Sequence, residues 1–170
     1  VNGGNTQTIS TTSASNNTTT SVSTSSGAVY SYALLSVSDA NACSQQQNSA
    51  TVITINKLPS ATILSNSLQI CENETMPLLT FTGSSGMHPY TFYYRLITAD
   101  DTSSLSVLST SGDKAIVQHA NNAAGVYLYK LDSVSYDKGK TCGKKLQNDS
   151  IQITVNPVPS ATFEGGASIC

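Results

Sequence analysis

Residues 126–156 read VYLYKLDSVSYDKGKTCGKKLQNDSIQITVN, and a shorter version, VYSYALLSVSDANACSQQQNSATVITIN, occupies residues 29–56. Both copies begin Val-Tyr-x-Tyr-x-Leu-x-Ser-Val-Ser, continue through a cysteine, and end in an alternating segment that closes on Asn. A similar junction follows each copy, NKLPSAT at 56–62 and NPVPSAT at 156–162. An internal repeat of this kind indicates how a chain is divided. The sequence therefore contains segments from two copies of one module.

The period of the repeat gives the size of the module. Pro59 and Pro159 are 100 residues apart, and Cys71 and Cys170 are 99 apart. Helical solenoid repeats run about 20 to 50 residues, whereas about 100 residues make a whole domain. We expect the C-terminal part of a module at 1–57, a complete module at 58–157 and the first strand of a third at 158–170, all within a longer protein.

Composition narrows the class of protein. Charged residues make up 11% and the net charge is −2, so no basic surface for nucleic acid is expected. Apolar residues make up 38% but form no run long enough for a transmembrane helix. Ser, Thr and Asn supply much of the remainder, and they favour strands and turns over helix interiors. The composition favours an all-β protein without membrane insertion.

Apolar residues alternate rather than follow a helical period. Ile151, Ile153 and Val155 share one face of the last segment of the longer copy. Seven or eight short strands in about 100 residues, separated by turn signals, are typical of an immunoglobulin-like β-sandwich. The sequence thus predicts tandem immunoglobulin-like modules. The expected strands are 60–64, 67–71, 77–82, 90–97, 104–109, 114–119, 126–137 and 147–155.

The alternation of apolar residues is interrupted within the expected strand 126–137, which contains Tyr127 and Tyr129. Val134 follows Leu131 by three positions, as Val37 follows Leu34 in the other copy. A strict period of two would place the valine on the wrong face, so we expect a β-bulge near Ser133 and its counterpart Ser36. The alternative is a valine that faces solvent or the second sheet.

Four cysteines in matching positions, with no ligand pattern for zinc, predict disulfides in an exported protein. Cys71 with Cys142 would close about 71 residues inside one module. The alternative pairs, Cys43 with Cys71 and Cys142 with Cys170, would each close about 28 residues and join neighbouring modules. Loop entropy gives roughly 4.4 against 3.6 kcal/mol per bridge, which does not decide between them. The intramodule pair is the preferred hypothesis.

Residues suited to chemistry are few. Tyr90, Tyr93 and Tyr94 are candidates for an aromatic platform that stacks on sugars, although tyrosines on a strand also pack in cores. The dense acidic spacing of a calcium loop is missing, and GSSG at 83–86 fits a glycine-rich turn and not a nucleophile elbow. We expect no enzyme, no catalytic residue, no metal site and no cofactor.

The run PSATILSNSLQICENETMPLLTFTGSSGMHPYTFYYRL, followed by AAGVYLYKLDSVS, a cysteine, and SIQITVNPVPSAT, resembles the tandem repeats of SprB-like giant gliding-motility adhesins of Bacteroidetes. The resemblance covers nearly the whole chain, and its most specific parts are TFTGSSGMHPYTFYY at 80–94 and the Pro-Ser-Ala-Thr junction. It implies a long filament at the cell surface, exported by the type IX secretion system and moved by the gliding machinery.

The resemblance also implies partners and modifications. The partners would be neighbouring repeats of the same chain, the gliding and secretion machinery, and a surface polysaccharide or substratum. The alternative function is a carbohydrate- or surface-ligand-binding module of a secreted multidomain protein. Ser133 in Asp-Ser-Val and Ser150 in Asp-Ser-Ile match the short pattern for O-glycosylation in these bacteria.

Overall fold

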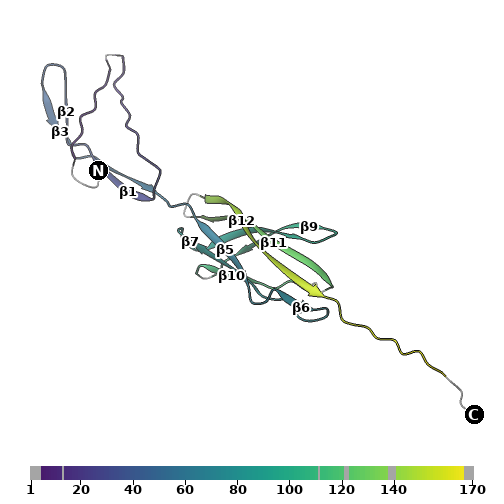
Figure 1. The fold of residues 1–170 in the computed structure, drawn as a ribbon. Helices are drawn as coiled ribbons and strands as arrows, with labels where there is room; N and C mark the ends of the chain where they lie inside the picture. Colours follow the sequence, from purple (N-terminus) through teal and green to yellow (C-terminus); the bar gives the residue numbers. More distant parts are fainter. Residues whose placement is uncertain (1–4, 13, 111, 121–122, 138–140, 167–170) are drawn as a thin grey trace, which may run out of the picture. The chain divides into compact units, whose positions relative to one another are not determined.

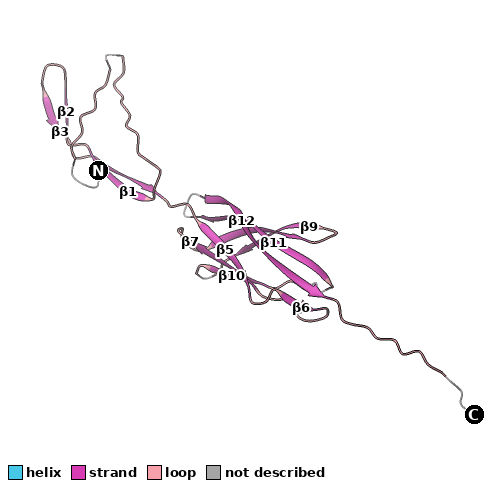
Figure 2. Cartoon of the chain, viewed as in Figure 1, coloured by secondary structure: helices cyan, strands magenta, loops and turns pink. Residues whose placement is uncertain are grey.

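Strands, turns and extended segments make up the described part of the chain, which contains no helix (Figure 1, Figure 2). The prediction of an all-β chain is therefore confirmed. None of the described segments is a helix able to cross a membrane. The chain divides into an N-terminal unit, Val1–Leu58, and a C-terminal unit, Pro59–Cys170. This computed structural model describes residues 5–12, 14–110, 112–120, 123–137 and 141–166.

The N-terminal unit is built around one bent hairpin. β1 (Ala28–Ala33) pairs antiparallel with β4 (Ala50–Ile55), and β2 (Ser36–Ser38) pairs with β3 (Ser44–Gln46). Two backbone hydrogen bonds join these pairs, from Leu34 N–H to Ser49 C=O at 2.8 Å and from Gln47 N–H to Leu35 C=O at 2.7 Å. At the far end of the hairpin, a carboxylate oxygen of Asp39 accepts the N–H of Cys43 at 2.9 Å.

The C-terminal unit contains a strand at each of the eight expected positions. The strand expected at 90–97 is found with those bounds, whereas the last strand begins at Thr141 instead of 147. Its first half pairs with the preceding strand despite its polar composition. The strands are β5 (Ser60–Ser65), β6 (Gln69–Cys71), β7 (Leu79–Ser84), β8 (Tyr90–Ile97), β9 (Thr102–Leu108), β10 (Lys114–Val117), β11 (Gly125–Asp137) and β12 (Thr141–Asn156).

These strands form two sheets that share one core. One sheet has the order β6-β12-β11-β8-β9, with β6 parallel to β12 and the other neighbours antiparallel. The other has the antiparallel order β10-β7-β5, and β5 lies against β11 and β12. Both sheets contribute buried side chains to a single cluster, led by Ile63, Phe81, Phe92, Tyr129 and Ile153.

The predicted bulge is present in β11. The register of β11 shifts between Leu131 and Ser133 against both of its neighbours. Leu131 and Val134 are consequently both 0% exposed although they are three positions apart. In the N-terminal unit the strand is interrupted between β1 and β2 at the matching place, but Val37 is 55% exposed. Its expected core position is therefore not found.

The junction and the C-terminal segment complete the description. The boundary between the two units, at Leu58 and Pro59, lies inside NKLPSAT. Residues 158–166, which belong to the segment expected to form the first strand of a third module, lie in no strand. The end of that expected strand, including Cys170, lies outside the described residues.

Candidate functional site

The three candidate platform tyrosines lie on two faces of β8. Tyr90 and Tyr94 are 2% and 4% exposed, whereas Tyr93 is 44% exposed. Successive side chains of a strand point to opposite faces of the sheet. Tyr90, Phe92 and Tyr94 therefore point into the core, and Tyr93 points outward. The hypothesis of a three-tyrosine platform is therefore wrong, and packing in the core explains two of its members.

Tyr90 is held by several core contacts. Its ring centroid lies 6.1 Å from that of Tyr136 in an edge-to-face arrangement, and its hydroxyl accepts the N–H of Gly86 at 3.1 Å. Its own N–H donates to Oγ of Ser109 at 2.7 Å, and the Ser109 N–H donates to the Tyr90 carbonyl at 2.8 Å. Ser109 is fully buried, so this pair of bonds satisfies a polar group inside the core.

The cysteine hypothesis changes with the strand register. Cys71 pairs with Asn156 at the end of β12, whereas Cys142 pairs with Tyr136 near its beginning. Gly125 and Tyr136 of β11 are 11 steps apart along the strand, which separates the two ends by about 36 Å at about 3.3 Å per step. A disulfide needs Cα atoms within about 7 Å. The intramodule bridge is therefore wrong for this fold, and both thiols are free.

The first alternative pair, Cys43 with Cys71, is not favoured by the position of either cysteine within its own unit. Cys43, also a free thiol, lies in the turn of its hairpin, and the chain leaves that unit at the opposite end, after Ile55. Cys71 lies at the end of its unit opposite to Ser60, where the chain begins β5. Neither cysteine is therefore at the junction end of its unit. Cys170 of the second alternative lies outside the described residues.

The bulge in β11 gathers charged groups on the outer face of the five-stranded sheet. Nε of Arg95 donates to Oδ2 of Asp132 at 2.7 Å, and Nη2 donates to Oδ1 at 2.8 Å. These bonds hold the pKa of Asp132 below its usual value, and the nearby charges of Arg95 and Lys130 act in the same direction. Both side chains are more than a third exposed, so solvent weakens the pair.

The two candidate glycosylation sites differ in exposure. Ser133, next to the Arg95–Asp132 pair, is half-buried and lies opposite Tyr93 in the sheet. Ser150 is exposed in β12 and lies opposite Lys130. An enzyme that modifies the folded protein would reach Ser150 more readily.

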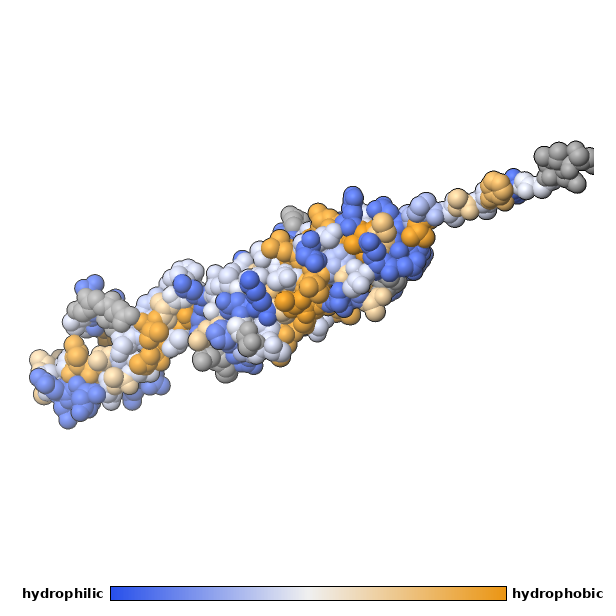
Figure 3. Space-filling view, turned by 90° about the horizontal axis from the view of Figure 1, so that it is seen from below, coloured by the Kyte–Doolittle hydropathy of each residue, from blue (hydrophilic) through white to orange (hydrophobic). Residues whose placement is uncertain are grey.

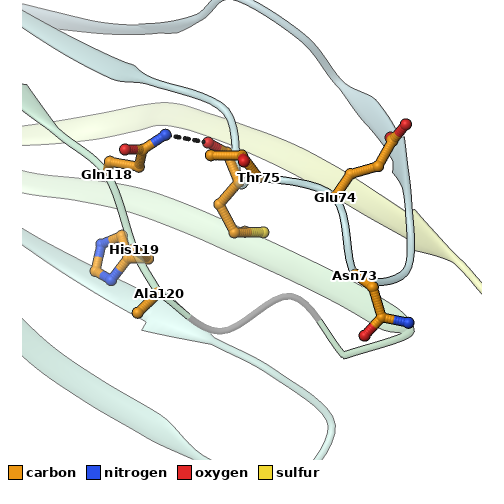
Figure 4. Close-up of a pocket in the computed structure, with 7 residues that line it drawn as sticks. Asn73, Glu74, Thr75, Gln118, His119 and Ala120 are labelled. Atoms are coloured by element: carbon orange, nitrogen blue, oxygen red, sulfur yellow. Dashed lines mark hydrogen bonds between the residues drawn. The ribbon is translucent and has the colours of Figure 1, made fainter.

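A shallow hollow of about 330 Å³ lies between the loop after β6 and the segment after β10 (Figure 4). Nε2 of Gln118 donates to the carbonyl of Met76 at 2.7 Å, which ties the two segments together. The side chain of Glu74 points away from His119 in this view and accepts the N–H of Cys71 at 2.8 Å. The hollow is lined by Asn73, Glu74, Thr75, Met76, Gln118, His119 and Ala120.

Among the described residues that line the hollow, two are of a type suited to proton transfer, Glu74 and His119, and the contacts of His119 are those of a packed ring. Its Nε2 lies 3.4 Å from the hydroxyl of Tyr94, and its ring centroid lies 5.2 Å from that of Tyr129. Burial lowers the pKa of His119 and raises the pKa values of both tyrosines. The imidazole is therefore neutral at pH 7, and the group acts as an aromatic cluster.

The described residues hold no group of three or more His, Cys, Asp or Glu side chains arranged to bind a metal. Asp101 instead accepts the hydroxyl of Ser103 at 2.6 Å, and Glu74 closes the turn after Cys71. The sequence did not reveal the polar contacts of Arg95 with Asp132 and of Ser109 with Tyr90, because they join residues 37 and 19 positions apart. Comparison of the chain with protein-family models and with curated proteins finds no match.

Proposed function

We propose that the chain is a structural segment of a long cell-surface adhesin filament, built from immunoglobulin-like β-sandwich modules, that mediates attachment and gliding on surfaces. The observation that carries the proposal is structural repetition. The pairing of β1 with β4 in the N-terminal unit has the same register as the pairing of β11 with β12 in the C-terminal unit. Tyr30 lies opposite Ile53, and Tyr127 lies opposite Ile153. A protein that repeats one structural unit gains length with each copy.

Two features of the C-terminal unit support the immunoglobulin-like assignment. The sheets β10-β7-β5 and β12-β11-β8-β9 correspond to the two-sheet division of that fold, with β11 in the place of strand F. At the start of β11 the hydroxyl of Tyr127 donates to the carbonyl of Ala123 at 2.8 Å. A tyrosine that bonds backward to the chain just before strand F is the tyrosine corner of immunoglobulin-like domains.

The path of the chain through this unit suits a load-bearing module. The chain begins β5 at the end where β11 and β12 are joined, and it leaves β12 at the opposite end, beside β6 (Figure 1). Tension along the filament would therefore act from one end of the unit to the other. β11 and β12 pair along nearly their whole length and would carry it through many backbone hydrogen bonds.

The adhesin role places the chain outside the cell, with neighbouring repeats as its immediate partners and the type IX secretion and gliding machinery acting through other parts of the parent protein. A surface polysaccharide or the substratum would be the object of attachment. The exposed side chain of Ser150 would be accessible to glycosylation during export.

An antibody raised against residues 58–157 tests the proposal on cells that make the protein. It should label intact cells and, as a monovalent fragment, reduce their attachment to glass and their movement on it. An antibody fragment of unrelated specificity is the control. Labelling that appears only after the cells are permeabilised would contradict the surface location. Surface labelling without any effect on attachment or movement would contradict the adhesin role.

A further inference from the structure

The two units carry the same hairpin with different surroundings. The register of β1 with β4 matches that of β11 with β12, at an offset of 97 residues in the first strand and 100 in the second. The residues of β1 and β4 therefore have defined counterparts in the C-terminal unit. Leu34 corresponds to Leu131, Val37 to Val134 and Ile53 to Ile153.

Residues 59–97 cover this face in the C-terminal unit. β5 lies against β11 and β12, and β8 pairs with β11. Ile63 and Phe81 contribute to the same buried cluster as the hairpin side chains, and the ring of Tyr90 contacts that of Tyr136. As a result, Leu131, Val134 and Ile153 are each 0% exposed.

The corresponding face of the N-terminal unit is exposed. Leu34 is 52% exposed, Val37 55% and Ile53 39%, and apolar side chains reach the surface of this unit in the space-filling view (Figure 3). Tyr30 and Tyr32, the counterparts of two buried tyrosines, are half-buried and stack on each other at 6.5 Å. A clustered apolar face of this kind indicates an interaction surface.

We propose that this face of the β1–β4 hairpin binds a polypeptide segment with the pattern of residues 59–97, in the way that β11 and β12 bind that segment within the C-terminal unit. The bound segment would lay strands equivalent to β5 and β7 over Leu34, Val37 and Ile53, with a strand equivalent to β8 beside β1. The inference rests on the shared register and the difference in exposure, and it does not depend on the adhesin role.

The proposal is tested by adding the missing type of segment to the N-terminus of the whole chain. A copy of residues 59–97 is joined ahead of Val1, which reproduces the spacing that separates this segment from β11. Hydrogen exchange of residues 28–33 and 50–55 is then compared in the natural and extended chains. We expect exchange in these strands to slow at least about tenfold on extension, because covered strands open less often. Exchange in β11 and β12 of the same molecule reports whether the C-terminal unit is folded.

Two matched variants make the test specific. Leu34→Ser should remove the added protection in the extended chain, whereas Val29→Ser, a change at a 50% exposed residue on the opposite face, should keep it. An added copy that carries Phe81→Asp and Phe92→Asp should give no protection. The inference is overturned if exchange at 28–33 is as fast in the extended chain as in the natural chain, or if the Asp-bearing copy protects equally.

Discussion

The hydroxyl of Tyr127 shows how one atom fixes the start of β11. It donates to the carbonyl of Ala123 at 2.8 Å while its ring is 4% exposed. Tyr127→Phe keeps the ring and removes the bond, so we expect the free energy of unfolding to fall by about 0.5–1.5 kcal/mol. Urea denaturation measures this, and Tyr93→Phe, at an exposed tyrosine, should have little effect. Equal stability of Tyr127→Phe and the natural chain would show that the bond contributes nothing.

Asp149 gives a residue-level prediction about pH. Burial raises the pKa of its carboxyl, and an opposing hydrogen bond from the N–H of Ile63 only partly offsets this. The folded protein therefore binds this proton more tightly than the unfolded chain, and stability falls as pH rises from the unfolded value of 3.8 through the folded pKa. Asp149→Asn should thus stabilise the protein at pH 7, and the gain should shrink toward pH 3.

Asp132 is the matched control for this prediction because its pKa shifts the other way. Its bonds to Arg95 lower the pKa, so its contribution is present above the unfolded value of 3.8 and is lost as pH falls through the folded pKa. Asp132→Asn should therefore destabilise the protein at pH 7. Urea midpoints of the two variants at pH 7 and pH 3 compare these effects. A loss of stability at pH 7 in Asp149→Asn would contradict the assignment.

At the level of elements, the packing of β7 against β8 depends on Gly83, which lies near the end of β7. A Cβ at Gly83 would lie 2.6 Å from Cδ2 of Tyr90, a ring that is 2% exposed. Gly83→Ala must therefore displace that ring, and we expect a loss of about 1–3 kcal/mol in the free energy of unfolding. The control is Gly166→Ala, where an added Cβ has no atom within 4 Å. An unchanged urea midpoint for Gly83→Ala would contradict this prediction, because it would mean that the ring of Tyr90 can move aside at no cost in stability.

The strands were predictable where the sequence carries a local signal. Alternation predicted β8 and β11, and the three-residue step from Leu131 to Val134 predicted the bulge. The first half of β12 lacks that signal, because its residues are polar and its pairing with β11 holds it in the sheet. The tyrosine platform failed because alternation within β8 sends Tyr93 outward and its neighbours inward.

Long-range pairings lay beyond the sequence for a physical reason. The spacing of cysteines gives the entropy of a closed loop, and that entropy does not reveal which ends of a sheet they occupy. Only the register places Cys71 beside Asn156 and Cys142 beside Tyr136. The bond between Arg95 and Asp132 likewise depends on the bulge, which turns Asp132 toward β8.

At the scale of the whole molecule, stability is concentrated in one unit. Every member of the buried apolar cluster lies between Ala61 and Val155, and the hairpin of the N-terminal unit contributes none. The expected complete module, residues 58–157, thus contains the whole cluster. The two units should unfold as separate events, because burial of apolar surface supplies the main stabilising free energy of a domain.

A polypeptide of residues 58–157 should therefore fold alone and keep the melting temperature of the C-terminal unit in the full chain. Calorimetry on both proteins measures this, and hydrogen exchange in β11 identifies the transition that belongs to this unit. A decrease of more than about 4 °C, equivalent to about 1 kcal/mol in a domain of this size, would contradict the prediction. Such a decrease would mean that residues before 58 stabilise the unit, although the buried side chains of its core all come from Pro59 onward.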